Sequence, residues 1–117
     1  MRTSAPEAFP DKPKLLRDPK ACKARQLQLS QPHIAPLTKF VQRLRDQYPK
    51  RQIPDFDPWD GGIKAELLFL LEAPGPNARD SGFISRNNHD ETAKNFFELN
   101  KDADIPRERT ITWNIVP

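Results

Sequence analysis

Cysteine and glycine are scarce in this sequence. Its 117 residues include one Cys, four Gly, one Met and one Tyr. The single cysteine, Cys22, cannot form a disulfide within the chain or a multi-cysteine metal site. We therefore expect a reducing compartment and no bound metal.

Long apolar runs are also missing. No stretch approaches the roughly 20 residues that a membrane-spanning helix needs, and the first residues, MRTSAPEAF, contain no apolar core of a secretory signal. The mean hydropathy is -0.79 and 30% of the residues are charged. We expect a cytoplasmic protein without a membrane partner.

Proline, in contrast, is abundant, with 13 residues in a chain that is long enough for one domain. Residues 1–30 are predicted to form a basic, Pro-rich segment that consists of a mobile arm and a short helix. This helix covers residues 19–29, with Asp18 as its N-cap and Pro19 in its first turn. Residues 31–117 are predicted to hold the folded domain.

Positive charge gathers in the amino-terminal half. Residues 1–60 carry 12 Lys and Arg against seven Asp and Glu, whereas residues 61–117 carry seven against nine. A second helix is predicted to start at Pro32 or Pro36 and to end near Tyr48. Three basic residues lie on its outer face: Lys39, Arg43 and Arg45. They either contact a nucleic-acid backbone or form an ordinary solvated helix surface.

The segment IPDFDPWDGG at residues 53–62 is dense in turn-forming residues. Its rings, Phe56 and Trp59, are expected to pin the loop to the core. The acidic residues could be mistaken for a calcium loop, but Pro58 lies between them and no later bidentate Glu stands at the required spacing. We interpret these residues as turn formers: Asp55, Asp57 and Asp60.

A continuous apolar run at residues 67–71 predicts a strand that is covered on both faces. The run ends at Glu72, which is followed directly by the sequence APGP. Ligands in open α/β sheets bind beyond the carboxyl ends of the strands, so Glu72 is a candidate site residue. The alternative is a solvated glutamate at a strand end.

The next elements complete a βαβ unit. Residues 73–88 are predicted to form a long binding loop with an exposed aromatic, Phe83. A helix follows over residues 91–101 with Asp90 as N-cap, and residues 109–116 form a second strand with Asn114 near its end. Because a right-handed crossover makes the strands parallel, Glu72 and Asn114 should converge.

Three segments carry a resemblance to a known family. LLEAPGP at residues 70–76, SGFISRNN at residues 81–88 and TITWNIVP at residues 110–117 resemble motifs of the uracil-DNA glycosylase superfamily. The similarity is to the group with a Glu-Ala-Pro-Gly motif, and it covers about residues 53–117. It implies an α/β fold: a three-layer α/β/α sandwich around a short parallel central sheet.

The resemblance also implies a function, the excision of uracil from DNA in base excision repair, without a cofactor. It assigns Glu72 to the attacking water and Ala73 to contact with the uracil. Phe83 corresponds to the aromatic that stacks on the flipped base, and Asn114 to the amide that reads the pyrimidine edge. Three further residues are expected at the pocket rim: Gly75, Ser85 and Asn88.

Two departures and two alternatives accompany this resemblance. The first departure is Leu71, which stands where the family often has Gly. The second concerns the family's His-Pro-Ser-type motif, which would follow the strand that ends at Asn114. We therefore expect an incomplete glycosylase domain, truncated after the second core strand. One alternative is a non-catalytic remnant that binds nucleic acid or protein. The other is a phosphate binder, which the absence of spaced glycines after the first strand disfavours.

Overall fold

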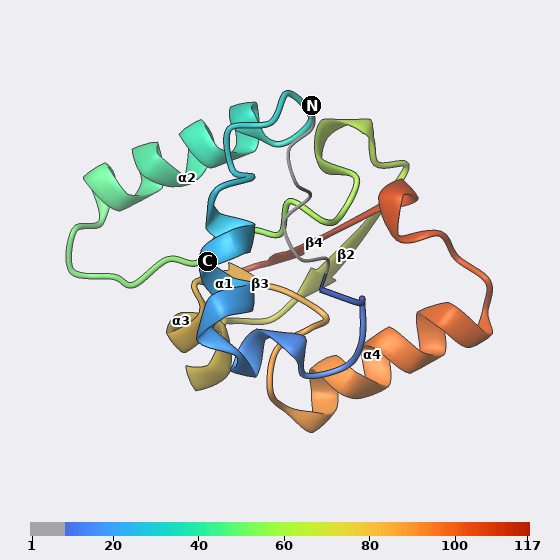
Figure 1. Ribbon diagram of the computed structural model, residues 1–117. Coiled ribbons are helices and arrows are strands. Elements are labelled where there is room, and N and C mark those ends of the chain that lie inside the picture. Colours follow the sequence, from blue (N-terminus) through green and yellow to red (C-terminus); the bar gives the residue numbers. More distant parts are fainter. Residues whose placement is uncertain (1–8) are drawn as a thin grey trace, which may run out of the picture.

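The structure, a computed structural model, describes residues 9–117. Two helices come first along the chain, and from residue 67 onward strands and helices alternate (Figure 1). The helices are α1 (Pro19–Gln26), α2 (Ala35–Gln47), α3 (Pro76–Ser81) and α4 (Glu91–Asp102). The strands are β1 (Asp55–Phe56), β2 (Leu67–Leu71), β3 (Phe83–Ile84) and β4 (Thr110–Asn114), and single 3-10 turns form η1 (Leu15–Arg17), η2 (Gly62–Lys64) and η3 (Arg107–Arg109).

The strands pair in parallel, as the βαβ prediction requires. β2 pairs with β4 over five residues, which places Leu71 opposite Asn114, and β1 pairs with β3 over two. The predicted parallel α/β class is thus confirmed. The strands form two pairs that meet at β4, because β1 and β3 are too short to extend the longer pair.

Helices cover opposite faces of the β2–β4 pair. Ile111 and Trp113 of β4 face the apolar stripe of α2, and the Trp113 ring stacks on Phe56 with 3.9 Å between the ring centroids. On the other face, Phe69 of β2 meets Phe96 of α4 edge to face at 4.9 Å. Figure 1 shows the strands between these two helices. Alternation along the strands therefore builds two separate apolar layers.

The predicted helix signals lie where the helices begin. The Asp18 carboxylate accepts a hydrogen bond from the Lys20 N–H, and Asp90 accepts one from Ala93 at 2.8 Å. Both caps satisfy backbone donors that the first helical turn leaves free. α1 ends at Gln26, three residues earlier than predicted. Within the described residues, no helix combines the length and apolar character needed to cross a bilayer.

The prediction of a mobile arm is wrong for the part of it that the structure describes. Leu15 and Leu16 are buried and pack with Ala21 and Phe83. The Leu16 N–H also donates to the Asn87 carbonyl at 3.0 Å. Two adjacent leucines thus anchor residues 9–19 to the body of the domain, while residues 1–8 lie outside the described part of the chain.

The prediction that both faces of β2 are covered is also wrong. Leu68 is 60% exposed and Leu70 is 52% exposed, and Leu67 and Leu71 are exposed as well. β4 pairs with one edge of β2, and in the described part of the chain no strand pairs with the other. A continuous apolar run therefore shows strand propensity here, but the leucines of an edge strand remain in contact with solvent.

A buried ionic cluster joins segments that are far apart in sequence. We call it the Asp57 cluster. The Asp57 carboxylate, which we predicted to be only a turn former, pairs with Arg25 of α1 at 3.0 Å and with Arg107 of η3. Arg107 Nε also donates to Asp60 at 2.8 Å. The Trp59 ring lies over Arg25, with the guanidinium carbon 3.7 Å from the ring centroid.

The two carboxyl groups of this cluster respond to burial differently. Burial favours the protonated form of Asp57, but Arg107 and Arg25, with the Ser85 hydroxyl and the Trp59 N–H, outweigh it and lower the pKa of Asp57. Burial raises the pKa of Asp60 to about 7, since the proximity of Asp57 adds to burial while Arg107 opposes it only in part. Asp57 is therefore the permanent anion, and Asp60 is the group that titrates.

The raised pKa of Asp60 predicts a specific pH dependence of stability. The Asp60 carboxyl binds its proton more tightly in the native state than in the unfolded state, so its protonation stabilises the fold. This contribution is complete below about pH 4, the pKa of an unfolded Asp, and is lost as the pH rises through the native pKa of about 7. The free energy of unfolding of the wild type, minus that of Asp60→Asn, should therefore fall from pH 4 to about 7 and then level off. Urea unfolding at each pH measures it. A difference that is constant with pH would contradict the assignment.

Candidate functional site

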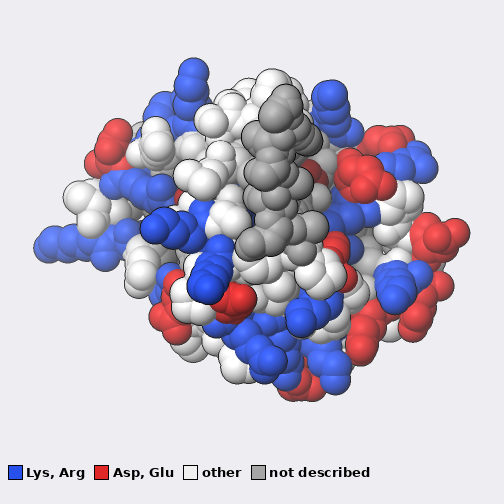
Figure 2. All heavy atoms as spheres, viewed as in Figure 1, with Lys and Arg blue, Asp and Glu red and all other residues white. Residues whose placement is uncertain are grey.

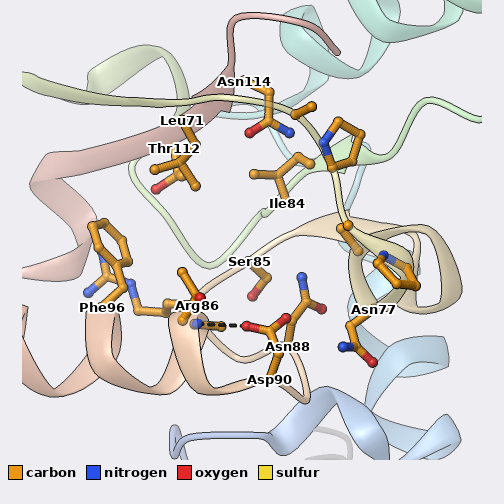
Figure 3. A pocket seen from close by; sticks show the side chains of 17 residues that line it. Leu71, Asn77, Ile84, Ser85, Arg86, Asn88, Asp90, Phe96, Thr112 and Asn114 are labelled. Atoms are coloured by element: carbon orange, nitrogen blue, oxygen red, sulfur yellow. Dashed lines mark hydrogen bonds between the residues drawn. The ribbon is translucent and has the colours of Figure 1, made fainter.

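A cavity of about 390 Å³ lies beyond the carboxyl ends of β2 and β4. Its walls come from the loop after β2, from α3, from the loop after β3, from the start of α4 and from the end of β4. Figure 3 shows Asn114 and Thr112 facing it from β4, across from Ser85 and Asn88. The volume is within the range of small-ligand sites, and the position is the one where parallel sheets bind ligands.

Most polar side chains around the cavity are already held by hydrogen bonds. The Asn88 amide accepts from the Ser81 hydroxyl at 2.6 Å and donates to the Phe83 carbonyl at 2.9 Å. The Ser85 hydroxyl donates to Asp57, which connects the cavity to the Asp57 cluster. These bonds fix the loop after β3, so its side chains form a rigid wall.

Asn114, like its neighbour Thr112 on β4, is not held in this way. Its side chain is 3% exposed, yet among the described residues its amide takes part in no side-chain hydrogen bond. In Figure 3 the amide group points into the cavity. An amide offers both a donor and an acceptor, so this group is well placed to bind a ligand in the cavity.

The three segments that resemble glycosylase motifs meet at this cavity. Leu71 and the run from Ala73 to Pro76 come from the first, Ile84 to Arg86 and Asn88 from the second, and Thr112 and Asn114 from the third. The predicted rim residues Gly75, Ser85 and Asn88 all border it. The predicted loop over residues 73–88 differs in one respect, because it contains α3 and β3. Pro76 starts α3 and Gly82, with a φ of 86°, ends it.

Glu72, the predicted catalytic residue, is not brought into the cavity. Its backbone lies at the same sheet edge as Asn114, and its carbonyl accepts from the Val116 N–H at 2.9 Å. Its side chain is exposed and does not border the cavity, whereas Leu71 and Ala73 on either side of it do. Successive side chains of an extended chain point to opposite faces. The backbones of Glu72 and Asn114 therefore converge as predicted, but the Glu72 carboxylate points away from the cavity.

Phe83 also differs from its predicted exposure. It is fully buried, packs against Leu15, Leu16 and Ala21, and does not border the cavity. In this conformation its ring is not accessible to a base. Phe96 of α4 is the aromatic side chain that borders the cavity instead. The sequence predicted an aromatic at the site but could not show which segment would cover Phe83.

The predicted backbone-binding residues of α2 fall into two groups. Lys39 and Arg43 are exposed, and neither borders the cavity. Arg45 instead folds back: its guanidinium donates to the Ile53 carbonyl at 2.7 Å and pairs with Asp55 at 3.2 Å. The prediction that Arg45 points away from the domain is therefore wrong, because its long side chain reaches a carbonyl and a carboxylate at the end of the next loop.

Two charged residues of the site were not recognised as such in the sequence. Arg86 borders the cavity, donates to the Thr110 hydroxyl at 2.9 Å, and lies over the Phe96 ring. Burial lowers the pKa of its guanidinium. Asp90, predicted as a helix cap, is also the one carboxylate among the described residues that line the cavity. The sequence feature that could have pointed to both residues is the polar run RNNHDE at residues 86–91.

Among the described residues, no group of three or more His, Cys, Asp or Glu side chains is placed to hold a metal ion. Comparison with known proteins found no matching family model, no matching curated protein and no matching solved structure. Any function must therefore be inferred from the cavity and the three motifs.

The burial of Phe83 predicts that it stabilises the fold. Phe83→Ala should lower the free energy of unfolding by about 3–5 kcal/mol, as for other buried aromatics, in urea titrations followed by circular dichroism. Phe40→Ala is the matched control, because Phe40 is 37% exposed and its truncation should cost less. Unchanged stability combined with weakened uracil binding would instead favour a stacking role.

Proposed function

We propose that this chain is a uracil-DNA glycosylase-like repair protein whose cavity receives a nucleobase flipped out of DNA. One observation carries the proposal: three motifs contribute walls to the same cavity at the carboxyl ends of parallel strands, although 21 residues of the sequence lie between the second motif and the third. The parallel register of β2 and β4 places the third motif beside the first, so the residues that the resemblance assigns to one site border one space. Extrusion of the base is needed because its reactive atoms are inaccessible inside a duplex.

Asn114 is the residue proposed to recognise the base. An amide offers a donor and an acceptor together, which match O4 and N3–H of uracil and oppose the amino group of cytosine. A site that is built to hydrogen-bond one base leaves buried groups unpaired when the other enters, and therefore rejects it. Ile84 and Phe96 supply apolar walls that exclude water around this contact.

The catalytic carboxylate is the less supported part of the proposal. The resemblance assigns the attacking water to Glu72, whose side chain points away from the cavity, whereas Asp90 borders it. The orientation of Glu72 favours a second candidate function, a non-catalytic module that binds uracil-containing nucleic acid or a protein. Both functions use the same cavity and the same Asn114 amide.

The proposed partner is uracil-containing DNA, and the proposed location is the cytoplasm. The sequence supports this location through its single cysteine, Cys22, because proteins of oxidising compartments are the ones that use disulfides.

Binding of single-stranded oligonucleotides tests the recognition step. The wild type should prefer an oligonucleotide with one central deoxyuridine over the same sequence with deoxycytidine, and Asn114→Ala should weaken this preference by about 1–3 kcal/mol, the contribution of one good base-reading pair. Asn95→Ala, on the exposed face of α4, is the control and should leave the preference unchanged. Equal loss in both variants would contradict base recognition by Asn114.

Release of free uracil from a labelled oligonucleotide separates the two candidate functions. If the chain is a glycosylase that uses Glu72, the wild type releases uracil, Glu72→Gln abolishes the release, and Asp90→Asn, which preserves the helix cap, retains it. Binding that depends on Asn114 without any release would favour the non-catalytic module. Release that survives Glu72→Gln but not Asp90→Asn would transfer the role to Asp90.

A further inference from the structure

A second hollow adjoins the proposed base cavity. It has a volume of about 390 Å³ and lies at the ends of β2 and β4, where Ala73 and Pro74 border both spaces. Three basic side chains line it: Lys50 and Arg51 from the loop after α2, and Arg79 from α3. Arg51 and Arg79 continue into a third, smaller hollow beside Ile53. The loop after β2 thus separates a neutral cavity from a basic surface.

Some basic residues elsewhere in the fold are neutralised by a carboxylate, whereas these three, like Lys39 and Arg43, are in no salt bridge among the described residues. Lys14, Arg45 and Arg109 each pair with a carboxylate within 4 Å. In the part of the chain that the structure describes, none of Lys50, Arg51 and Arg79 has such a partner, and no acidic residue lines the hollow. Figure 2 shows Lys and Arg side chains at the left of the molecule, over the end of α2 and the following loop. The surface is open to an external anion.

Arg79 is held in place at the boundary between the two spaces. Its Nη2 donates to the Pro74 carbonyl at 3.1 Å, which ties α3 to the loop after β2. One hydrogen bond occupies one of the five N–H donors of a guanidinium, so the others remain available. A planar guanidinium binds phosphate oxygens through two parallel hydrogen bonds.

We propose that Lys50, Arg51 and Arg79 bind the phosphate backbone of the nucleic-acid strand whose base enters the adjoining cavity. This inference rests on the proposed function, because it takes the occupant of the cavity to be a base. A nucleotide joins a largely apolar ring to an anionic backbone through one sugar. The structure offers an apolar cavity and a cationic hollow on the two sides of Ala73 and Pro74.

This surface is a better candidate than the outer face of α2. Lys39 and Arg43 are exposed but border neither hollow, and Arg45 is paired with Asp55. Binding of a nucleic-acid strand to Lys39 and Arg43 would not bring that strand to the cavity. A strand that contacts Lys50, Arg51 and Arg79 already lies beside the entrance to it.

The salt dependence of DNA binding tests the proposal. The probe is a fluorescent single-stranded oligonucleotide with one deoxycytidine in place of the uracil, and its dissociation constant is measured between about 50 and 200 mM salt. Each lost phosphate contact lowers the slope of log affinity against log salt concentration by about 0.7 units on single strands. The triple variant Lys50→Ala, Arg51→Ala, Arg79→Ala should therefore reduce the slope by about two units. The double variant Lys50→Ala, Arg51→Ala keeps the Arg79–Pro74 hydrogen bond and should reduce it by more than one unit.

A matched control has the same loss of charge elsewhere. Arg17→Ala, Lys39→Ala, Arg43→Ala removes one Lys and two Arg from exposed positions outside the hollow and should leave the slope unchanged. An unchanged slope in the first triple variant, or an equal fall in both triple variants, would overturn the proposal. Competition by poly-glutamate as strong as that by the oligonucleotide would also overturn it, since the surface would then bind polyanions in general.

The uracil-containing oligonucleotide distinguishes failure of this inference from failure of the proposed function. The preference for deoxyuridine over deoxycytidine should survive in the first triple variant, because Asn114 is intact. If the wild type shows no such preference but the slope still falls in that variant, the backbone surface stands and the base assignment fails. If the preference is present and the slope does not fall, the base assignment stands and the backbone surface fails.

Discussion

The buried charge of Asp57 is the constraint on which the rest of this structure depends. A carboxylate with no access to water is tolerated only if it is fully paired, and Asp57 obtains its partners from Arg25 in α1, Ser85 after β3 and Arg107 in η3. Removal of one partner from a buried pair typically costs about 3–5 kcal/mol. The pairs therefore hold the amino-terminal helix, the loop on one side of the cavity and the start of β4 in one arrangement.

This arrangement also fixes the geometry of the site. Ser85 lines the cavity and bonds to Asp57, and Arg107 directly precedes the strand that carries Asn114. The loop after β2 reaches the same place independently, because the parallel register sets Leu71 opposite Asn114. A charge cluster and a strand register together thus bring the three motifs into contact, although neither of these interactions involves a ligand.

Our two proposals assign the cavity and the basic hollow to the two parts of a nucleotide. The walls of the cavity are mainly apolar, and the Asn114 amide points into it, which suits a base. The hollow on the other side of Ala73 and Pro74 is lined by three cations and, among the described residues, by no acidic side chain, which suits a phosphate backbone. In contrast, Glu72 points away from the base side. The cavity geometry thus bears on the proposed recognition of a base, whereas it places no Glu72 carboxylate beside that base.

The sequence by itself determined the local features of this protein. The caps Asp18 and Asp90, the strand at Leu67–Leu71 and the parallel βαβ connection followed from short-range rules, because hydrogen bonding at helix ends and crossover handedness depend on neighbouring residues. The tertiary structure alone decided what is buried. It covered Phe83 with Leu15 and Leu16, exposed the leucines of β2, turned Arg45 back to Asp55 and made Asp57 the centre of a cluster. Burial depends on contacts between residues far apart in the chain, and neither periodicity nor composition records which segments will meet.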